Sequence, residues 1–369
     1  MSTNARIYLD FNATAPLVAA ARSAMVRALD VLGNPSSVHA EGRAARDLVE
    51  TARNQVAALA GRPREEVIFT SGGTEANGLG ISRLAAEVEQ RGLPRVVATT
   101  AREHPSLRGA VDALRARGWE VRHVIDWTDE PAHGAGLLAI GASNHELGTT
   151  VDLTGATSTH ARLVHVDAVQ LAGKRSLAAI PAGASVAISA HKIGGPQGVG
   201  ALITGIDGGD DLDAGHQERG RRAGTENTVG IVGFGAAAAA IDLTTWDRVV
   251  ELGARFEAGL IALGARINAA GWPKIGGTAN AAFPGARGES IVIALDLAGI
   301  SVSTGAACTS GSIKPSPVLL AIGQSPEEAR EAVRFSLGRT TTLEEIERVL
   351  AVLPEIVARA RPSTPVGPR

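Results

Sequence analysis

The chain has 369 residues, a formal net charge of −2 at pH 7 and 44% hydrophobic residues. This balance of charge argues against a protein that a basic field holds to nucleic acid, and a single cysteine excludes a disulfide scaffold. The N-terminus lacks the apolar core of a signal peptide, and no run of about 20 apolar residues is long enough to cross a membrane. We therefore expect a cytoplasmic protein of roughly two domains.

Up to about residue 245, short apolar runs alternate with helical patterns. Residues 41–60 place Ala44, Leu48 and Val56 on one stripe and predict an amphipathic helix, and a second helix is expected over 105–117. This alternation indicates an α/β protein with a mainly parallel sheet that helices cover on both faces. The runs of strand length are 67–70, 95–100, 119–124, 137–143, 163–166, 185–189 and 199–204.

From about residue 246 the pattern becomes that of a smaller α/β domain. We expect a large domain over 16–248 and a small domain that comprises 1–15 and 249–369. The elements predicted in this second part are helices over 246–269, 289–299 and from 343, and strands at 279–283, 301–303 and 333–337.

Polar clusters directly follow several of the predicted strands. In an open α/β sheet, ligands bind outside the carboxyl ends of the strands, so we expect the functional site there. The clusters are SGGTE (71–75), REH (102–104), SNHE (143–146), DAVQ (167–170) and SAHK (189–192).

Lysine is scarce in this chain, which limits the candidates for a reactive amine to Lys174, Lys192, Lys274 and Lys314. Lys192 follows a predicted strand and precedes a Gly-Gly-Pro turn. Partial desolvation in a cleft would lower the pKa of its amine and suit it to forming a Schiff base. The alternative is a surface lysine beside a turn.

Three further groups fit a cofactor site. The helix start at 71–77, with the hydroxyls of Ser71 and Thr74, could hold a phosphate or could be an ordinary capped helix. Asp167, at a strand end, needs a cationic partner, either a pyridinium nitrogen or an arginine. His104 could stack on an aromatic cofactor and move protons, or could be solvated. With a lysine on a neighbouring strand end, these groups predict a pyridoxal 5'-phosphate (PLP) site.

Long motifs extend over nearly the whole chain and resemble one family. They are YLDFNATAPL (8–17), GNPSSVHAEGRAAR (33–46), EVIFTSGGTEANGLGI (66–81), REHPSL (102–107), HVDAVQLAGK (165–174), ISAHKIGGPQGVGALI (188–203), GHQERGRRAGTENTVGIVGFG (215–235), STGAACTSGSIKPSPVLLAIG (303–323) and VRFSLGRTTT (333–342). Together they resemble the cysteine desulfurases of the NifS/IscS type, in the class V aminotransferase superfamily. The resemblance implies the fold-type I of PLP-dependent transferases, in which the large domain holds a mainly parallel, seven-stranded type of sheet and the smaller domain is α/β.

The resemblance also implies a role for each matching residue. Lys192 would form the covalent link to PLP, and His104 would stack on the ring and assist proton transfer. Asp167 would pair with the pyridine nitrogen and Gln170 with the phenolic oxygen. The phosphate ligands implied are Gly73, Thr74, Ser189 and His191, with Thr225 of the partner subunit, so a homodimer is expected. Arg334 would hold the substrate carboxylate, with help from Asn34.

Two departures from the family pattern stand out. The family commonly has a second Asn where this chain has His145, a position that contacts the phenolic oxygen. An imidazole N–H could replace the amide donor, but the charge of an imidazole depends on pH. The substitution either alters the electronics of the cofactor and the enzyme's substrate preference, or is a tolerated exchange of one donor for another. The chain also ends soon after its last helix, without the longer tail that housekeeping members use to dock a scaffold protein.

Cys308 is the only cysteine and lies among small residues, in a loop of about 303–314. With L-cysteine as substrate, Lys192 and His104 would move the Cα proton, and the Cys308 thiolate would attack the substrate sulfur to give a persulfide and alanine. Small neighbours would let the loop carry sulfur outward to an acceptor protein. The alternative is a chance free thiol.

The sequence thus predicts a PLP-dependent cysteine desulfurase, a sulfurtransferase with no metal, nucleic acid or membrane partner. Iron–sulfur cluster biosynthesis is the expected context, although thionucleosides, thiocofactors and sulfur-containing natural products are alternative destinations for the sulfur. One alternative function is a related class V enzyme that does not use Cys308, namely a C–S or selenocysteine lyase or an aminotransferase. Another is a non-catalytic regulatory homologue.

Overall fold

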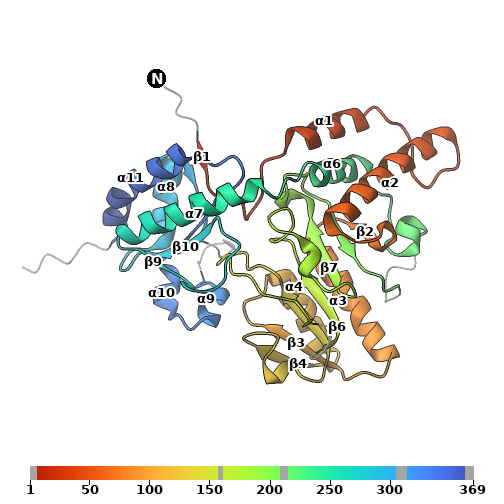
Figure 1. Cartoon of the computed structure of the whole chain (residues 1–369), viewed down its shortest axis with the longest axis horizontal. Helices are drawn as coiled ribbons and strands as arrows, with labels where there is room; N and C mark the ends of the chain where they lie inside the picture. The colour runs from red at the N-terminus through yellow and green to blue at the C-terminus, as the bar shows by residue number, and fades with distance from the viewer. Residues whose placement is uncertain (1–5, 157–160, 208–214, 305–313, 362–369) are drawn as a thin grey trace, which may run out of the picture. The chain divides into compact units, whose positions relative to one another are not determined.

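The computed structural model describes residues 6–156, 161–207, 215–304 and 314–361 (Figure 1). The chain forms two compact units. The large unit comprises Thr14–Ser143 and Val151–Leu243, and the small unit comprises Met1–Ala13, Asn144–Thr150 and Thr244–Arg369. The short segment 144–150 thus belongs to the small unit, although the chain on both sides of it belongs to the large one.

A seven-stranded sheet forms the centre of the large unit, in the order β2-β8-β7-β6-β5-β3-β4. Four strand pairs are parallel, and only β8 runs antiparallel to its neighbours β7 and β2, so the predicted mainly parallel sheet is confirmed. Strands such as β3 and β7 are buried at every residue, which explains their unbroken apolar runs. The strands are β2 (Val67–Thr70), β3 (Val96–Thr100), β4 (Glu120–Val124), β5 (Ala135–Gly141), β6 (Ala161–Asp167), β7 (Ser185–Ser189) and β8 (Gly200–Ile203).

Helices pack on this sheet and on one another. The predicted amphipathic helix is confirmed as α2, although Ala44 of the expected stripe is exposed and Ala45 is buried instead. The helix ends at Ala60, and Gly61 caps it in the left-handed conformation that glycine favours. The Ala- and Gly-rich α6 lies so close to α2 that a Cβ at Gly235 would be 2.5 Å from the Ala52 Cα. The helices of the large unit are α1 (Ala19–Ala28), α2 (Ala40–Ala60), α3 (Gly73–Gln90), α4 (Pro105–Ala116) and α6 (Thr228–Ala239), with 3₁₀ turns η1 (Arg64–Glu66), η2 (Glu130–Ala132), η3 (Leu177–Ala179), η4 (Ala190–Lys192) and η5 (Gln217–Gly220).

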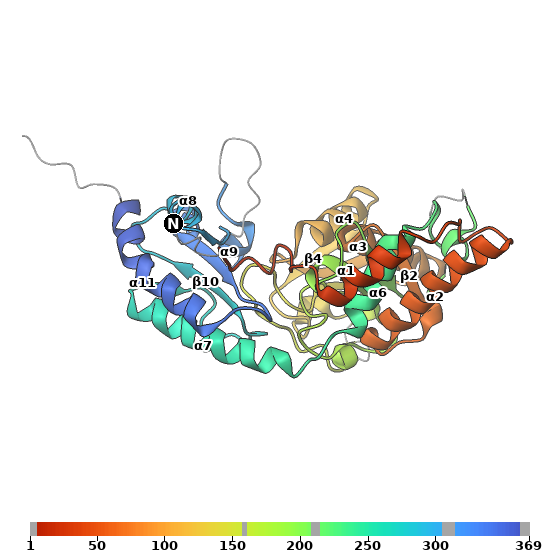
Figure 2. The ribbon, with the colours of Figure 1, turned by 90° about the horizontal axis from the view of Figure 1, so that it is seen from above.

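The small unit has its own apolar core, in which the rings of Phe256 and Phe335 meet edge to face at 5.2 Å. Figure 2 shows α7 running beside β10, which it contacts. The expected helix over 246–269 is too long: α7 ends at Ala262, because the chain turns at Gly264, with φ of 82°, to enter β9. The elements are parallel β1 (Ile7–Tyr8) and β11 (Ile300–Ser301), antiparallel β9 (Arg266–Ile267), β10 (Thr278–Ala282) and β12 (Ala332–Ser336), and helices α7 (Thr245–Ala262), α8 (Gly288–Leu297), α9 (Pro317–Ala321), α10 (Pro326–Arg330) and α11 (Leu343–Ala360).

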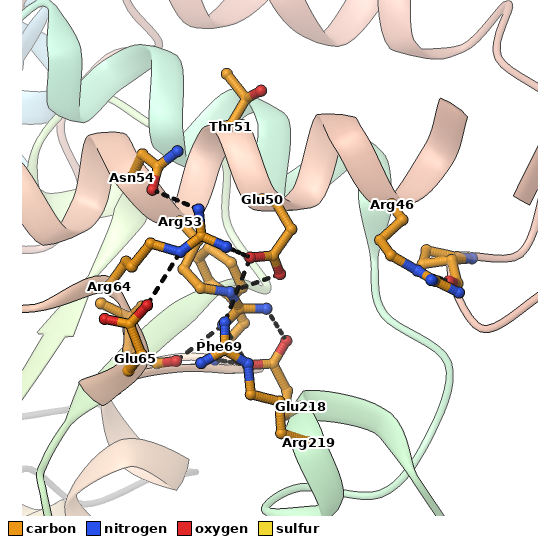
Figure 3. A network of polar contacts seen from close by, with 12 residues as sticks. Arg46, Glu50, Thr51, Arg53, Asn54, Arg64, Glu65, Phe69, Glu218 and Arg219 are labelled. Atoms are coloured by element: carbon orange, nitrogen blue, oxygen red, sulfur yellow. Dashed lines mark hydrogen bonds and ion pairs between the residues drawn. The ribbon is translucent and has the colours of Figure 1, made fainter. Parts of the chain in front are cut away.

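A buried ion pair anchors the turn η5, which precedes the segment that carries Thr225 (Figure 3). The Glu218 carboxylate accepts hydrogen bonds from both terminal nitrogens of Arg53, at 2.7 and 2.9 Å, and from the Phe69 backbone N–H at 2.9 Å. Glu218 and Arg219 both have positive φ, a conformation that costs a non-glycine residue about 1 kcal/mol or more. The buried pair offsets this strain and fixes the path of the turn.

We expect Glu218→Ala to lower the free energy of unfolding by about 3 kcal/mol, because the buried Arg53 loses the carboxylate that binds both of its terminal nitrogens and keeps only Glu50, which pairs with its Nε at 3.0 Å. Urea unfolding at a fixed protein concentration measures the change. Glu65→Ala is the matched control, since Glu65 pairs with Arg64 at 3.3 Å on the surface, and its effect should stay below about 1 kcal/mol. Equal effects of the two variants would contradict the role given to Glu218.

Candidate active site

Several predicted site residues lie at strand ends of the large unit. Asp167 ends β6 and Ser189 ends β7, and these strands are parallel neighbours. Lys192 ends η4, the turn that directly follows β7, while His104 is the N-cap of α4, after β3. Gly73 is the first residue of α3, after β2.

Electrostatic effects show that three of these groups lie close together. Partial desolvation lowers the pKa of His104, while the charge of Asp167 acts in the opposite direction and that of Lys192 adds to the lowering. His191 responds in the same way: burial, with a contribution from Lys192, lowers its pKa to about 4. The region around the Lys192 amine therefore holds two imidazoles that are neutral at neutral pH.

The start of α3 has the properties of a phosphate site. The first N–H groups of a helix have no carbonyl partner within it and attract anions. The Ser189 hydroxyl is buried without a hydrogen-bond partner among the described residues, and a Cβ at Gly73 would approach the Ser189 Cβ to 3.5 Å and the Val169 side chain to 2.7 Å. A small first residue, an unused hydroxyl and a helix N-terminus thus meet here and fit a phosphate ester. Thr74, the second residue of α3, is exposed.

Asp167 is held in one orientation by two donors. The Val169 N–H donates to Oδ1 at 3.0 Å, and the Asn77 amide donates to Oδ2 at 2.7 Å. A carboxylate fixed at a strand end is a suitable partner for a cationic ring nitrogen. Asn77 was not predicted as a site residue, because a residue inside a helix shows no sequence signal for a partner on a distant strand.

Gln170 is oriented by a second residue for which no role was predicted. Its side-chain oxygen accepts a hydrogen bond from the Lys174 ammonium at 3.0 Å, and both side chains are buried. Because the oxygen faces Lys174, the Gln170 NH₂ group points elsewhere and serves as a donor. The spacing of four residues and the scarcity of lysine were the signals that could have identified Lys174.

Arg334 and His145 both belong to the small unit and contact each other there. The Arg334 guanidinium pairs with Asp10 at 2.6 Å and donates to the His145 backbone oxygen at 3.1 Å. Its Nε is buried without a partner among the described residues. The His145 ring lies 3.6 Å from the Glu146 carboxylate. Arg334 is thus held in place on two nitrogens, and its Nε–H is among the donors that remain for a carboxylate.

Three predicted residues are not brought to these groups by any contact described here. Asn34 is exposed, and its side chain caps a local turn by accepting from the Ser36 N–H at 2.9 Å. Thr225 is exposed on the segment between η5 and α6. Cys308 lies outside the described residues. The roles of all three remain predictions.

Glu103, next to His104, is a buried acid that sequence reasoning missed. Its carboxylate accepts from the Thr100 hydroxyl at 2.7 Å and from the Gly141 N–H at 2.8 Å. Burial raises its pKa to about 7; the negative charge of Asp167 adds to the rise, and the two hydrogen bonds oppose it. Glu103 therefore ties the turn that carries His104 to the end of β5.

We expect Glu103→Gln to become progressively more stable than the native chain as the pH rises. The pKa of Glu103 is about 7 in the folded state and about 4.3 when unfolded, so between these pH values the folded chain binds more protons and loses stability as the pH rises. Glutamine lacks this dependence, and the advantage should approach roughly 3 kcal/mol near pH 8. Urea unfolding from about pH 5 to 8 measures it, with the exposed Glu347→Gln as control. A constant difference across this range would contradict the assignment.

No helix in the described part of the chain is long and apolar enough to cross a membrane.

Residues 7–349 match the model of the class V aminotransferase family. The cysteine desulfurase of Cereibacter sphaeroides is 39% identical over 98% of both chains.

Solved structures agree with this match. A NifS-like protein superposes with a TM-score of 0.83 at 30% identity, covering 96% of this chain and all of the other. The structure of SspA in complex with cysteine superposes with a TM-score of 0.75 at 25% identity, covering 91% of this chain and 100% of SspA. The chain therefore belongs to the class V aminotransferase family, alongside the cysteine desulfurases.

Proposed function

We propose that this protein is a PLP-dependent cysteine desulfurase that converts L-cysteine to L-alanine. The observation that carries the proposal is the cluster of Lys192, His104 and Asp167 at the strand ends of the large unit, in which Lys192 and Asp167 both lie near enough to affect the pKa of His104. The near full-length relatives named cysteine desulfurase support the same activity, and the family is PLP-dependent.

Each part of the cofactor has a matching residue on this chain. Lys192 supplies the amine that attaches PLP, and Asp167 supplies the carboxylate for the ring nitrogen. His104 offers a ring to stack on PLP, while Gln170 and His145 are the proposed donors to its phenolic oxygen. When bound, PLP withdraws electrons from the substrate Cα and Cβ. The proposed phosphate ligands are Gly73, Thr74, Ser189 and His191, with Thr225 of the partner subunit in a homodimer.

Separate residues of this chain bind the substrate and move its protons. Arg334, with Nε still available, binds the L-cysteine carboxylate, and Asn34 assists. The Lys192 amine takes the Cα proton and returns a proton to the product, with His104 beside it.

The sulfur step uses Cys308. Its thiolate attacks the substrate sulfur, the Cβ–S bond breaks, and Cβ takes up a proton. The balance is L-cysteine plus the Cys308 thiol giving L-alanine plus the Cys308 persulfide. A sulfur-acceptor protein then receives the outer sulfur, and iron–sulfur cluster biosynthesis is the proposed context.

The test is alanine formation from L-cysteine with a thiol reductant. We expect Cys308→Ala to keep the visible absorbance of bound PLP and to lose alanine formation, because no thiolate remains to take the sulfur. Equal alanine formation in both proteins would favour a direct lyase, and its absence from both, with PLP bound, would indicate another substrate or a non-catalytic homologue.

A lysine pair tests the cofactor assignment separately. Lys192→Ala should lose both the bound absorbance and the activity, because the attaching amine is removed. Lys274→Ala is the matched control, since the Lys274 ammonium pairs with Glu257 at 2.7 Å within the small unit. A Lys192→Ala protein that forms alanine at the native rate would contradict the assignment.

A further inference from the structure

A hydrogen-bonded network links Asp167 to His104 through Asn77, which also orients Asp167, and through Ser106. The Asn77 amide nitrogen lies 2.7 Å from Asp167 Oδ2 and 2.9 Å from Ser106 Oγ. Ser106 Oγ in turn lies 2.7 Å from His104 Nδ1, and the Ser106 backbone N–H donates to the same Nδ1 at 3.1 Å. All four residues belong to the large unit.

The orientation of the Asn77 amide follows from its partners. A carboxylate only accepts hydrogen bonds, so the NH₂ group of Asn77 faces Asp167. Its oxygen then faces His165 Nε2, at 3.0 Å. His165 therefore carries its proton on Nε2, and its Nδ1 accepts from the Ser185 hydroxyl, at 3.2 Å.

His165 is a rigid end point for this network. The ring is fully buried, and burial lowers its pKa to about 3, so it is neutral and carries one N–H. A Cβ at Gly80 would lie 2.4 Å from the ring, so the helix leaves room for the imidazole only because position 80 is glycine. With one N–H on His165, a single arrangement of donors satisfies the whole network.

The same logic fixes the proton of His104. One hydrogen of the Asn77 NH₂ group goes to Asp167 and the other to Ser106 Oγ. The Ser106 hydroxyl, which accepts from Asn77, directs its own hydrogen to His104 Nδ1. Two donors thus converge on Nδ1, which is an acceptor, and the neutral ring carries its proton on Nε2.

We propose that Asn77 and Ser106 are positioning residues that hold His104 as the neutral Nε2–H tautomer while they orient the Asp167 carboxylate. This inference rests on the proposed function. Its chemical consequence is that His104 exchanges protons through Nε2 and does not act as a cationic acid, because a proton on Nδ1 would face the Ser106 backbone N–H and force the Ser106 hydroxyl to turn its hydrogen away. The Asn77 amide therefore influences both groups: it orients the Asp167 carboxylate directly, and it fixes the tautomer of His104 through the Ser106 hydroxyl.

The charged and titratable groups around His104 are Asp167, Lys192, Arg108 and the adjacent Glu103. Both hydrogen bonds described at Nδ1 come from Ser106, one from its hydroxyl and one from its backbone N–H, so Ser106 sets the tautomer in the proposed network. A substitution at Ser106 therefore tests the proposal without removing any of these charges.

The experiment is ¹⁵N NMR of the PLP-loaded protein with labelled histidine, in which His104→Gln identifies the His104 signals. In the native protein we expect the Nε2–H tautomer at neutral pH. Ser106→Ala should shift the tautomer ratio toward Nδ1–H by about fivefold, the usual effect of one lost hydrogen bond. Ser106→Thr, which keeps the hydroxyl, should restore the native signals, and kcat should fall in Ser106→Ala and recover in Ser106→Thr with KM unchanged.

Ser176→Ala is the matched control, because it removes a serine hydroxyl with a local hydrogen bond elsewhere in the large unit, where Ser176 accepts from the Ala178 N–H at 3.2 Å at the start of η3. It should leave the His104 signals unchanged. Unchanged His104 signals in Ser106→Ala would overturn the inference even if alanine is formed. A shifted tautomer in a protein that forms no alanine would support the network and reject the proposed function instead.

Discussion

The site of the large unit depends on the parallel register of β5, β6 and β7. Gly141 pairs with Asp167, and Asp167 pairs with Ala187, two residues before Ser189. Because parallel strands run in one direction, each delivers the residues that follow it to the same edge of the sheet. A slip of one residue would turn Asp167 to the other face and separate it from its donors. The chemistry assigned to Lys192, which follows β7, rests on this register.

The polar groups at that edge are bound to one another rather than left to water. Asp167 has Asn77 and the Val169 N–H, Gln170 has Lys174, and Glu103 has two donors of its own. A buried polar atom without a partner costs about 1–3 kcal/mol, so such mutual satisfaction stabilises a single arrangement. Groups that are already oriented need little reorganisation when charge develops during a reaction. Ser189 Oγ and Arg334 Nε lack partners in the described structure, which is why they are candidates for ligand contacts.

In the small unit, the cation Arg334 is likewise oriented by hydrogen-bond partners. Arg334 is oriented by a carboxylate from the N-terminal segment and by a backbone oxygen from segment 144–150. His145 therefore has a structural role through its carbonyl that any residue could fill, while its side chain is the part that departs from the family pattern. This separation explains how the position can change without disturbing Arg334.

The sequence by itself determined the kind of sheet and placed the candidate site residues directly after its strands. Unbroken apolar runs reveal strands that are covered on both faces, and motifs such as SAHK and DAVQ place Lys192 and Asp167 directly after them. These signals are local, so they can be recognised in a short stretch of sequence. The membership of segment 144–150 in the small unit and the end of α7 at Ala262 were not visible in this way.

Only the tertiary structure decided which side chains meet. Asn77 and Asp167 are 90 residues apart, Arg53 and Glu218 are 165 apart, and Arg334 and Asp10 are 324 apart. The protonation of Glu103 and His165 likewise depends on burial by elements from elsewhere in the chain. Residue type therefore specifies what a side chain can donate, accept or ionise, whereas the partner and the dielectric surroundings that select among those states exist only after the chain has folded.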